Sequence, residues 1–340
     1  MINQSSERHS HGPWVDVHAH PGRCFLGGLD PTSPMALMLG AENAAAAVQS
    51  SLLGEVAVVN SATVADMVLI GLGADGGLHA MRSFEPGEAV ADHRRQINAM
   101  DALIDGHTVA AVLSSGDIVE VASGDIPGVF VSCEGADFLD GQLGGLDDAY
   151  SDGVRSITLV HYHVNELGDI QTEDSVHGGL TTFGREVVTE MNRLGMIVDL
   201  AHATFEATVA ALDASTAPIM ISHSHLASAG SDHPRLLSVE HATAVADGGG
   251  LIGAWPSGVI QTTLDDYCAE ICRLVDVVGI DHVSIGTDMD ANYKPVLTTY
   301  EQFPDVAASL LNRGMTSDEV DQVLGGNFIQ LFKAVEAVAG

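Results

Sequence analysis

The chain has 340 residues, of which 46% are hydrophobic and 17% are charged, a composition that excludes a disordered chain. The 46 acidic residues against 13 basic ones give a formal net charge of -33, which opposes binding to nucleic acid or to anionic lipid. The length suits one barrel-sized domain or two smaller ones, and the strand spacing described below favours one.

Signals for disulfide stapling, secretion or membrane insertion are missing from this sequence. The four cysteines include no C-x-x-C pair and indicate no disulfide framework. Residues 1–13 are polar and lack the short basic segment followed by an apolar run that marks a signal peptide, so no signal peptide is predicted. Apolar stretches such as Leu52–Gly71 are interrupted by polar and charged residues. We expect a cytoplasmic protein that is not attached to a membrane.

The first predicted strand runs from Trp14 to His20 and is buried on both faces, as parallel strands are. A glycine-rich loop over Pro21–Asp30 follows it. The segment Pro31–Met67 mixes alanine-rich helical pieces with apolar pieces, and its element boundaries are left open. Helical spacing returns at Gln96–Ile104.

Strands and helices then alternate through the rest of the chain. Thr182–Leu194 carries one apolar stripe and predicts a helix, with Gly195 as its C-terminal stop. Strands are predicted over Gly128–Cys133, Gly153–Val160, Met196–Leu200, Pro218–Ser222, Gly250–Trp255 and His282–Gly286. About eight such units predict an α/β fold of the (β/α)8 (TIM) barrel type, which would form one domain over residues 1–340.

The C-terminal segment predicts two helices separated by a glycine pair. Thr316 and Glu319 form a capping box at the start of the first helix, and Gly325-Gly326 ends it. The terminal helix has an apolar face that we expect to pack on the barrel, formed by Phe328, Leu331, Phe332 and Val335.

Five apolar runs end in a histidine or a carboxylate. They are Val15–His20, Val131–Gly135, Val198–His202, Ile221–Ser224 and Ile285–Asp288. The C-terminal ends of the strands of a (β/α)8 barrel surround one mouth, so these endings should converge. Four imidazoles and one carboxylate would then share one rim: His18, His20, His202, His223 and Glu134.

Each of these residues also has an ordinary structural interpretation. His18 and His20 lie two apart on a strand, point the same way and can bind one cation, but histidines near strand ends are often only hydrogen-bonded. Glu134 could be a charge solvated at the start of a loop. A carboxylate can bridge two divalent ions, whereas a neutral imidazole cannot, so Glu134 is the natural bridge of a two-metal site. The pattern favours a metal-centred hydrolase.

Longer stretches of the sequence are specific enough to indicate a family. They are Gly153–His161, Leu180–Val188, Asn192–His202, Ile221–Ser224, Asp232–Arg235, Gly286–Asp290 and Gly325–Asn327. In them the chain resembles the membrane dipeptidase (renal dipeptidase) family of the amidohydrolase-type barrels. The resemblance spans about Trp14 to Ala339 and is weakest from Cys24 to about Val121.

The resemblance implies a binuclear zinc centre. His18 and position 20 would bind one zinc ion, His202 and His223 would bind a second, and Glu134 would bridge the two. The family usually has aspartate at the position of His20, so the first site of this chain carries one negative charge less. The resemblance also implies a homodimer.

The resemblance further implies three roles at the substrate. His161 would face the scissile carbonyl, Arg235 the substrate carboxylate and Asp288 the attacking water. From the residues alone, Arg235 could equally anchor a loop through a salt bridge. Asp290 is the rival of Asp288, which we favour because it ends an apolar run and matches the position in the family.

These observations predict a binuclear zinc-dependent dipeptidase that hydrolyses dipeptides with a free C-terminal carboxylate. One alternative is a metal-dependent amidohydrolase of the same fold that acts on another small amide or lactone. Another is a non-catalytic barrel that keeps a metal for binding or stability. The presence of Asp288 and His161 beside all five candidate ligands argues against the last alternative.

Overall fold

The computed structural model describes residues 11–32, 37, 39–40, 42–74, 76–228, 231 and 233–340. Parallel strands follow the order β1-β2-β6-β7-β8-β9-β11-β12 around one sheet. A hydrogen bond of 3.0 Å from Val17 N to Ile285 O and a parallel bridge between Ala19 and Met289 join the two ends of this order. The sheet is therefore a nearly closed (β/α)8 barrel, which confirms the predicted fold class.

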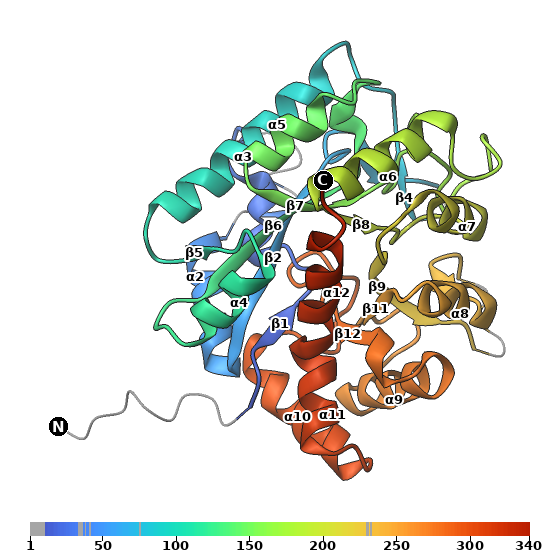
Figure 1. Ribbon diagram of the computed structural model, residues 1–340. Coiled ribbons are helices and arrows are strands. Elements are labelled where there is room, and N and C mark those ends of the chain that lie inside the picture. The colour runs from blue at the N-terminus through green and yellow to red at the C-terminus, as the bar shows by residue number, and fades with distance from the viewer. Residues whose placement is uncertain are drawn as a thin grey trace.

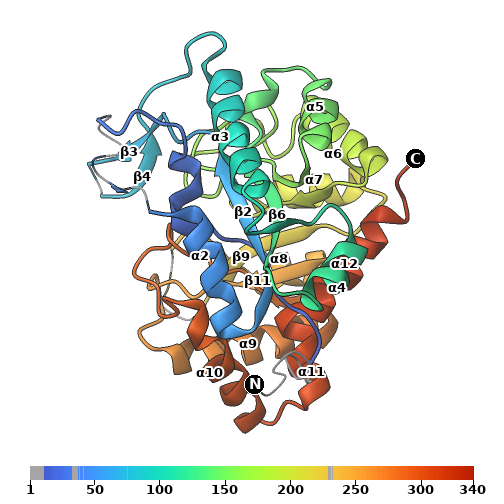
Figure 2. The ribbon, with the colours of Figure 1, turned by 90° about the vertical axis from the view of Figure 1, so that its left-hand side faces the viewer.

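The strands of the barrel are short and buried. They are β1 (Trp14–Asp16), β2 (Val56–Val64), β6 (Gly128–Glu134), β7 (Val154–Thr158), β8 (Ile197–Asp199), β9 (Met220–Leu226), β11 (Leu251–Ala254) and β12 (Val283–Ile285). Two short strands extend the sheet: β5 (Ala110–Ala111) pairs with β6, and β10 (Leu236–Leu237) pairs with β9. Figure 2 shows a separate antiparallel hairpin, β3 (Ile70–Leu72) with β4 (Leu78–Ala80), at the outer edge of the molecule.

Helices surround the strands, as Figure 1 shows. They are α2 (Ala44–Ser50), α3 (Glu88–Asp105), α4 (Ser115–Ala122), α5 (Gly145–Ser151), α6 (Thr182–Leu194), α7 (Phe205–Ala214), α8 (Val239–Asp247), α9 (Leu264–Val278), α10 (Phe303–Asn312), α11 (Ser317–Asp321) and α12 (Asn327–Glu336). Short 3-10 helices are η1 (Pro21–Leu26), η2 (Ser51–Gly54), η3 (Asp137–Leu139), η4 (Ile280–His282) and η5 (Tyr300–Gln302), and η6 (Gln322–Gly326) is a π-helix. Among the described helices, none combines the length and apolar character needed to cross a bilayer.

The terminal helix α12 closes one end of the barrel. Phe328 and Phe332 of α12 make edge-on contacts with the ring of Phe130, at centroid distances of 5.4 and 5.5 Å. Phe130 lies near the start of β6, and the same apolar cluster contains early strand residues such as Val15 and Ile197. The predicted apolar face of this helix is thus confirmed, and α12 covers the N-terminal end of the strands. The opposite, C-terminal end carries the candidate site.

Local sequence signals placed several helix ends correctly. The helix over Thr182–Leu194 has the predicted bounds, and Gly195 follows it with φ 75° and ψ 31°, a left-handed conformation that glycine adopts without strain. The predicted capping box of Thr316 and Glu319 is present with both of its hydrogen bonds.

Other boundaries differ from the prediction. The first strand ends at Asp16 instead of His20, because the chain beyond Asp16 pairs with the other end of the sheet, through the hydrogen bond from Val17 N to Ile285 O and the bridge at Ala19. Part of the predicted loop Pro21–Asp30 is the 3-10 helix η1. The segment Pro31–Met67, whose element boundaries the sequence does not define, contains β2, all nine residues of which are buried.

Candidate metal centre

Four strand ends bring the five candidate ligands to the C-terminal mouth of the barrel. His18 and His20 follow β1, Glu134 is the last residue of β6, His202 follows β8, and His223 lies within β9. All five side chains are buried, with at most 4% of their surface exposed. The structure thus brings these five residues together, in two groups that share Glu134.

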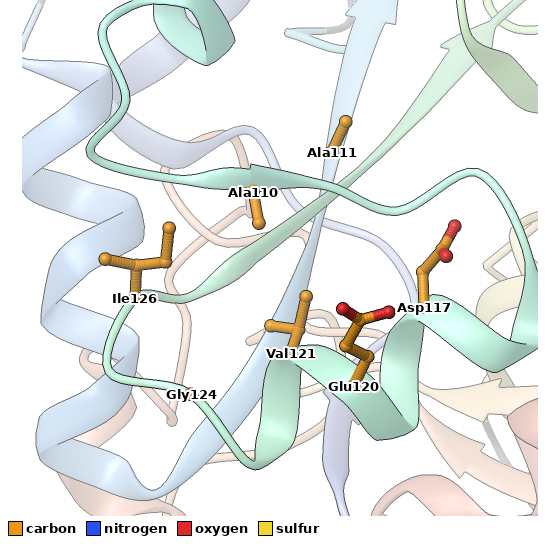
Figure 3. A pocket seen from close by; sticks show the side chains of 7 residues that line it. All are labelled: Ala110, Ala111, Asp117, Glu120, Val121, Gly124 and Ile126. Carbon is orange, nitrogen blue, oxygen red and sulfur yellow. The ribbon is translucent and has the colours of Figure 1, made fainter.

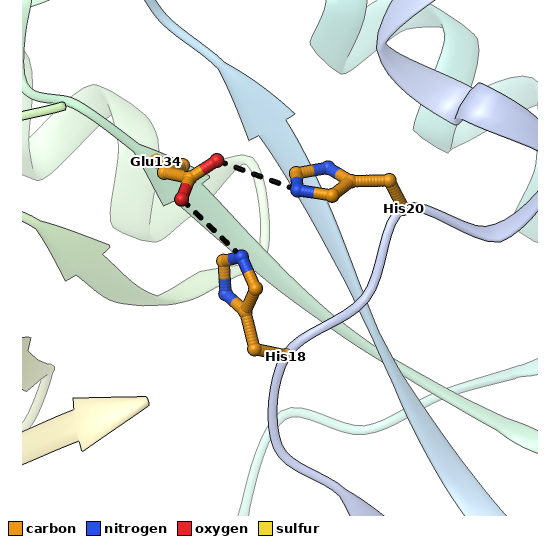
Figure 4. A group of neighbouring side chains, drawn as sticks. All are labelled: His18, His20 and Glu134. Atoms are coloured by element: carbon orange, nitrogen blue, oxygen red, sulfur yellow. Dashed lines mark ion pairs between the residues drawn. The ribbon is translucent and has the colours of Figure 1, made fainter. Parts of the chain in front are cut away.

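The first group contains His18, His20 and Glu134 (Figure 4). Nε2 of His18 lies 3.4 Å from Oε1 of Glu134, and Nε2 of His20 lies 3.3 Å from Oε2. Figure 4 shows the two rings reaching the carboxylate from one chain segment, with one ring at each oxygen. The H-x-H pair therefore faces a single carboxylate although its two residues lie past the end of the strand.

The second group contains His202, His223 and the same carboxylate. Nε2 of His202 lies 3.1 Å from Oε1 of Glu134 and 3.2 Å from Nε2 of His223. The Nε2 atom of His223 lies 3.6 Å from the same Oε1 atom of Glu134. His202 has φ 67°, in the left-handed region that costs energy for a residue other than glycine. Strain of this kind is concentrated at functional sites, where the surrounding structure imposes it.

The spacing and chemistry of these atoms fit divalent cations. Nitrogen ligands lie about 2.0–2.1 Å from zinc, so two ligands of one tetrahedral ion are about 3.4 Å apart. The separations between the facing atoms are 3.1 to 3.6 Å. Nε2 of His18 is buried and has no hydrogen-bond partner. Four buried imidazole groups facing one carboxylate, one of them with no hydrogen-bond partner at Nε2, form a donor set that suits zinc.

The charges around the centre also fit cations. Burial and neighbouring positive charges, including that of Arg235, hold the pKa values of His202 and His223 well below the usual range, so both rings are neutral and offer a lone pair. Burial lowers the pKa of His20 as well, but its contacts with Asp288 and Glu134 outweigh burial and raise that pKa to about 10. Two carboxylates beside His20 thus favour a positive charge at this place.

Outer contacts fix the rings so that their Nε2 atoms face the centre. Nδ1 of His20 lies 3.0 Å from the carbonyl oxygen of Ala62, and Nδ1 of His223 lies 3.0 Å from Oγ of Ser222. Oδ1 of Asp199, at the end of β8, accepts a 2.9 Å hydrogen bond from the Ser222 N–H. Such partners of metal-binding histidines set the ring orientation.

The structure distinguishes the two aspartates that follow β12. Oδ1 of Asp288 lies 3.3 Å from Nε2 of His20, and its Oδ2 accepts a 3.1 Å hydrogen bond from the indole N–H of Trp255. Asp290 instead accepts a 2.6 Å hydrogen bond from the backbone N–H of Gly22 and anchors the start of η1. The strand itself ends at Ile285, three residues before Asp288. The prediction that Asp288 directly ends the strand is therefore wrong. The turn after the strand carries Asp288 to the centre with φ 53°.

His161 lies against the carboxylate shared by the two groups. Its Nε2 is 3.4 Å from Oε2 of Glu134, and its Nδ1 is 2.6 Å from Oδ1 of the buried Asp66. Burial lowers the pKa of His161, but the negative charges of Asp66 and Glu134 raise it above the usual value. One edge of the imidazole therefore faces the centre while the other edge is held from behind.

Arg235 is buried beside the centre with part of its guanidinium group unpaired. Nη1 donates a 2.6 Å hydrogen bond to Oε1 of Gln171, while Nε and Nη2 have no hydrogen-bond partner. The guanidinium carbon lies 5.4 Å from the ring centroid of Trp255. No described carboxylate lies within salt-bridge distance of this arginine, so the alternative role as a loop anchor through a salt bridge has no partner among the described residues. Asp232, in the same sequence stretch, lies outside the described residues.

Three contacts at the centre were not anticipated from the sequence. Asp66 follows β2, Trp255 follows β11, and Gln171 lies in the loop between β7 and α6. For Asp66 a signal existed, because a run of nine strand residues ends two positions before a carboxylate, as in the other endings. Trp255 and Gln171 had no such signal, since an aromatic or an amide side chain after a strand is ordinary.

A hollow on the outer surface lies away from the candidate metal centre. Figure 3 shows this hollow of about 310 Å³, lined by Ala110, Ala111, Asp117, Glu120, Val121, Gly124 and Ile126. It lies beside β5 and α4, where β5 pairs with the start of β6, and it contains no histidine. Asp117 is already bonded there to the backbone N–H of Leu113. This hollow is not part of the candidate centre.

Sequence comparison finds similar proteins that are named dipeptidases. Dipeptidase tcpJ from Claviceps purpurea is 34% identical over 196 residues, covering 55% of this chain and 46% of that protein. Dipeptidase aclJ from Aspergillus oryzae is 32% identical over 274 residues, covering 75% of this chain and 64% of that protein. The chain thus spans less than two thirds of the length of these two relatives.

Solved structures show the same fold over nearly the whole chain. The probable dipeptidase PvdM from Pseudomonas aeruginosa superposes with a TM-score of 0.80 at 19% identity, covering 98% of each chain. A metallopeptidase from Rhodobacter sphaeroides, solved with a phosphinate mimic of the dipeptide L-Ala-D-Ala, has a TM-score of 0.79 at 18% identity and covers 96% of this chain and 100% of that one.

The family assignment rests on a match that extends over most of the sequence. Residues 38–340 match the membrane dipeptidase family, peptidase family M19. The matched range contains Glu134, His202 and His223. His18 and His20 precede this range, and the fold brings them to the same centre. The family resemblance found in the sequence is thus confirmed: this chain belongs to the membrane dipeptidase family, peptidase family M19.

Proposed function

We propose that this chain is a metal-dependent dipeptidase that holds two divalent ions, zinc first among them, in one barrel domain. His18, His20 and Glu134 would hold one ion, and His202, His223 and Glu134 the other. The observation that carries the proposal is that two buried donor groups share one carboxylate next to the partly unpaired guanidinium group of Arg235. Divalent ions, when bound, supply an acidified water and polarise the carbonyl that this water attacks.

Asp288 is the residue placed to move the proton. One of its oxygens faces the centre at His20, and the other is occupied by the Trp255 indole, so a single oxygen is available to accept a proton from the attacking water. The same oxygen can then give that proton to the leaving amine nitrogen when the peptide bond breaks. Asp66 and Glu134 raise the pKa of His161 above its usual value, so its Nε2–H beside Glu134 can donate a hydrogen bond to the substrate carbonyl oxygen as negative charge develops there.

Arg235 accounts for the preference for a dipeptide. A carboxylate of the substrate would receive hydrogen bonds from Nε and Nη2, the two guanidinium nitrogens without a partner. Arg235 is buried, and its charge is felt by His202 and His223, so the carboxylate it binds must lie close to the scissile bond. A free C-terminus one residue from that bond meets this requirement, whereas the interior of a longer chain does not.

Metal removal tests the cofactor directly. We expect purified protein to carry up to two zinc or similar ions, and a chelator to abolish hydrolysis of dipeptides with a free C-terminus, because the donor groups alone cannot acidify water. Metal content would be measured by mass spectrometry and hydrolysis by product release from a dipeptide panel. Zinc added back should restore activity. Full activity in the metal-free protein would contradict the proposal. If the protein hydrolysed other amides or lactones but no dipeptide, the proposed substrate class would be wrong.

The carboxylate role of Arg235 is tested with a matched pair of substrates. Arg235→Met should raise KM for a free-acid dipeptide by far more than for its C-terminal amide, because only the free acid loses a charge-assisted hydrogen bond. Steady-state kinetics on both substrates measures the difference. Arg155→Met is the control, since Arg155 is also buried but donates to the backbone carbonyl oxygens of Leu113 and Tyr150. Equal losses on both substrates in Arg235→Met would remove Arg235 from this role.

A further inference from the structure

A fully buried carboxylate holds the edge of His161 that points away from the shared carboxylate. Asp66 has no exposed surface, and its Oδ1 lies 2.6 Å from Nδ1 of His161. Its Oδ2 accepts a 2.8 Å hydrogen bond from the backbone N–H of Tyr162, the next residue. Both oxygens of Asp66 are thus engaged by one short segment after β7, although Asp66 itself follows β2.

The contact fixes which nitrogen of His161 donates a hydrogen bond to Asp66. An ionised carboxylate only accepts hydrogen bonds, so Nδ1 must carry a proton to bond with Asp66. Nε2 is then the atom presented to Glu134, at 3.4 Å. Rotating the ring by half a turn would place a carbon against Asp66 and break the hydrogen bond. The ring therefore has one favoured orientation.

We propose that Asp66 is a positioning residue for His161, which it holds with Nδ1 protonated and Nε2 directed at the substrate carbonyl. The inference rests on the dipeptidase function proposed above, and it adds a residue outside the stretches in which the family resemblance is strong. Asp66 touches neither the candidate ligands nor the substrate, and it acts only through His161. The carboxylates that stand behind catalytic or metal-binding histidines act in this way, by fixing the tautomer and the angle of the ring.

The chain offers a matched control for this pair. Asp137 is also buried, and its Oδ1 lies 2.6 Å from Nδ1 of His163. His163 packs edge-on against the ring of Phe84 at a centroid distance of 5.5 Å and is not among the groups at the centre. The two aspartate–histidine contacts are therefore equal in length, and both aspartates are buried, but the His163 side chain is 24% exposed against 8% for His161, and the two histidines face different groups.

Kinetics with a double-mutant cycle provide the first test. Asp66→Ala in the zinc-loaded protein should lower kcat by about 10- to 100-fold, the usual effect of losing such a partner, with KM changed by less than about threefold and metal content unchanged. In a His161→Gln background the same change should lower kcat by less than about twofold, because the residue through which Asp66 acts is gone. Asp137→Ala should leave kcat within about twofold of the wild type.

The tautomer of His161 provides a second test that needs no activity. Zinc-loaded protein with ¹⁵N-labelled histidine should show protonated Nδ1 at His161, with the signal assigned by its loss in His161→Gln. Asp66→Asn keeps the shape but has one acceptor oxygen for two donors. The Tyr162 N–H has no other partner, so the amide NH₂ group turns to His161 and Nδ1 should become unprotonated. This variant decides the question even where Asp66→Ala fails to fold.

The outcomes separate this inference from the proposed function. Equal losses from Asp66→Ala in both His161 backgrounds, or an unchanged Nδ1 in Asp66→Asn, would overturn the positioning role. Hydrolysis of no dipeptide by the wild type would instead remove the proposed function, while the NMR result would still show whether Asp66 sets the state of His161. A loss of metal in Asp66→Ala would also contradict the inference, because it would place the effect at the ligands.

Discussion

Replacing Asp288 with asparagine should lower kcat for a dipeptide by about 10²-fold or more while the metal content stays near that of the wild type. The amide keeps the shape of the carboxylate and can still accept the hydrogen bond of the Trp255 indole. It cannot take a proton from water or give one to the leaving amine. Steady-state kinetics together with metal analysis of the same preparation measures both parts of this expectation.

The neighbouring aspartate provides the control for that experiment. Asp290→Asn keeps an oxygen that can accept the hydrogen bond from the Gly22 N–H. Unlike Asp288, Asp290 forms no ion pair with a candidate ligand. We expect its kcat to stay within about threefold of the wild type, since no proton transfer depends on it. Wild-type turnover in Asp288→Asn, with a large loss in Asp290→Asn, would exchange the roles of the two residues.

Truncating His202 should remove metal and activity together. His202→Ala deletes an imidazole whose Nε2 lies 3.1 Å from Glu134 and 3.2 Å from His223, so the second group keeps two of its three donors. Three protein ligands are the usual minimum of a catalytic zinc site. We expect at least one of two ions to be lost and the rate to fall at least as far as in Asp288→Asn. Metal analysis and kinetics at several zinc concentrations measure this.

A second buried histidine separates metal loss from general damage to the fold. His241 of α8 is as buried as His202, and its Nε2 lies 2.8 Å from the hydroxyl oxygen of Thr208. His241→Ala should lower the melting temperature but keep the metal content and kcat of the wild type, because its partner is a helix residue and not the centre. Full metal content in His202→Ala would exclude His202 as a ligand.

The variants of a metal ligand and of the proton-transfer residue should differ because the two residues have different tasks. A ligand is needed to keep the ion, so its loss is read in metal content, whereas Asp288 is needed to move a proton, so its loss is read only in kcat. Both expectations depend on burial: His202 is 4% and Asp288 is 8% exposed, so little bulk water is present to replace a missing donor or to carry the proton.

The sequence by itself determined the repeating architecture and identified the five candidate ligands. Parallel strands buried on both faces are written as short apolar runs, so a histidine or glutamate that interrupts the end of such a run is conspicuous. That is why the sequence identifies Glu134 as a candidate ligand at the end of β6, whereas His223 lies within β9 and not at its end. Local signals were equally sufficient for α6, where Thr181 caps one end and Gly195 the other, since both interactions lie within one turn of the helix.

The tertiary structure alone decided what stands behind the donors. Asp66 and His161 are 95 positions apart, and Trp255 and Asp288 are 33 apart, so no periodicity or spacing relates them. Such pairs form because neighbouring strands and their loops meet at one mouth. A carboxylate or an indole after a strand gains its role only from the side chain that another loop places beside it. Closure of the barrel makes that placement, by joining β1 to β12 and putting β2 between β1 and β6.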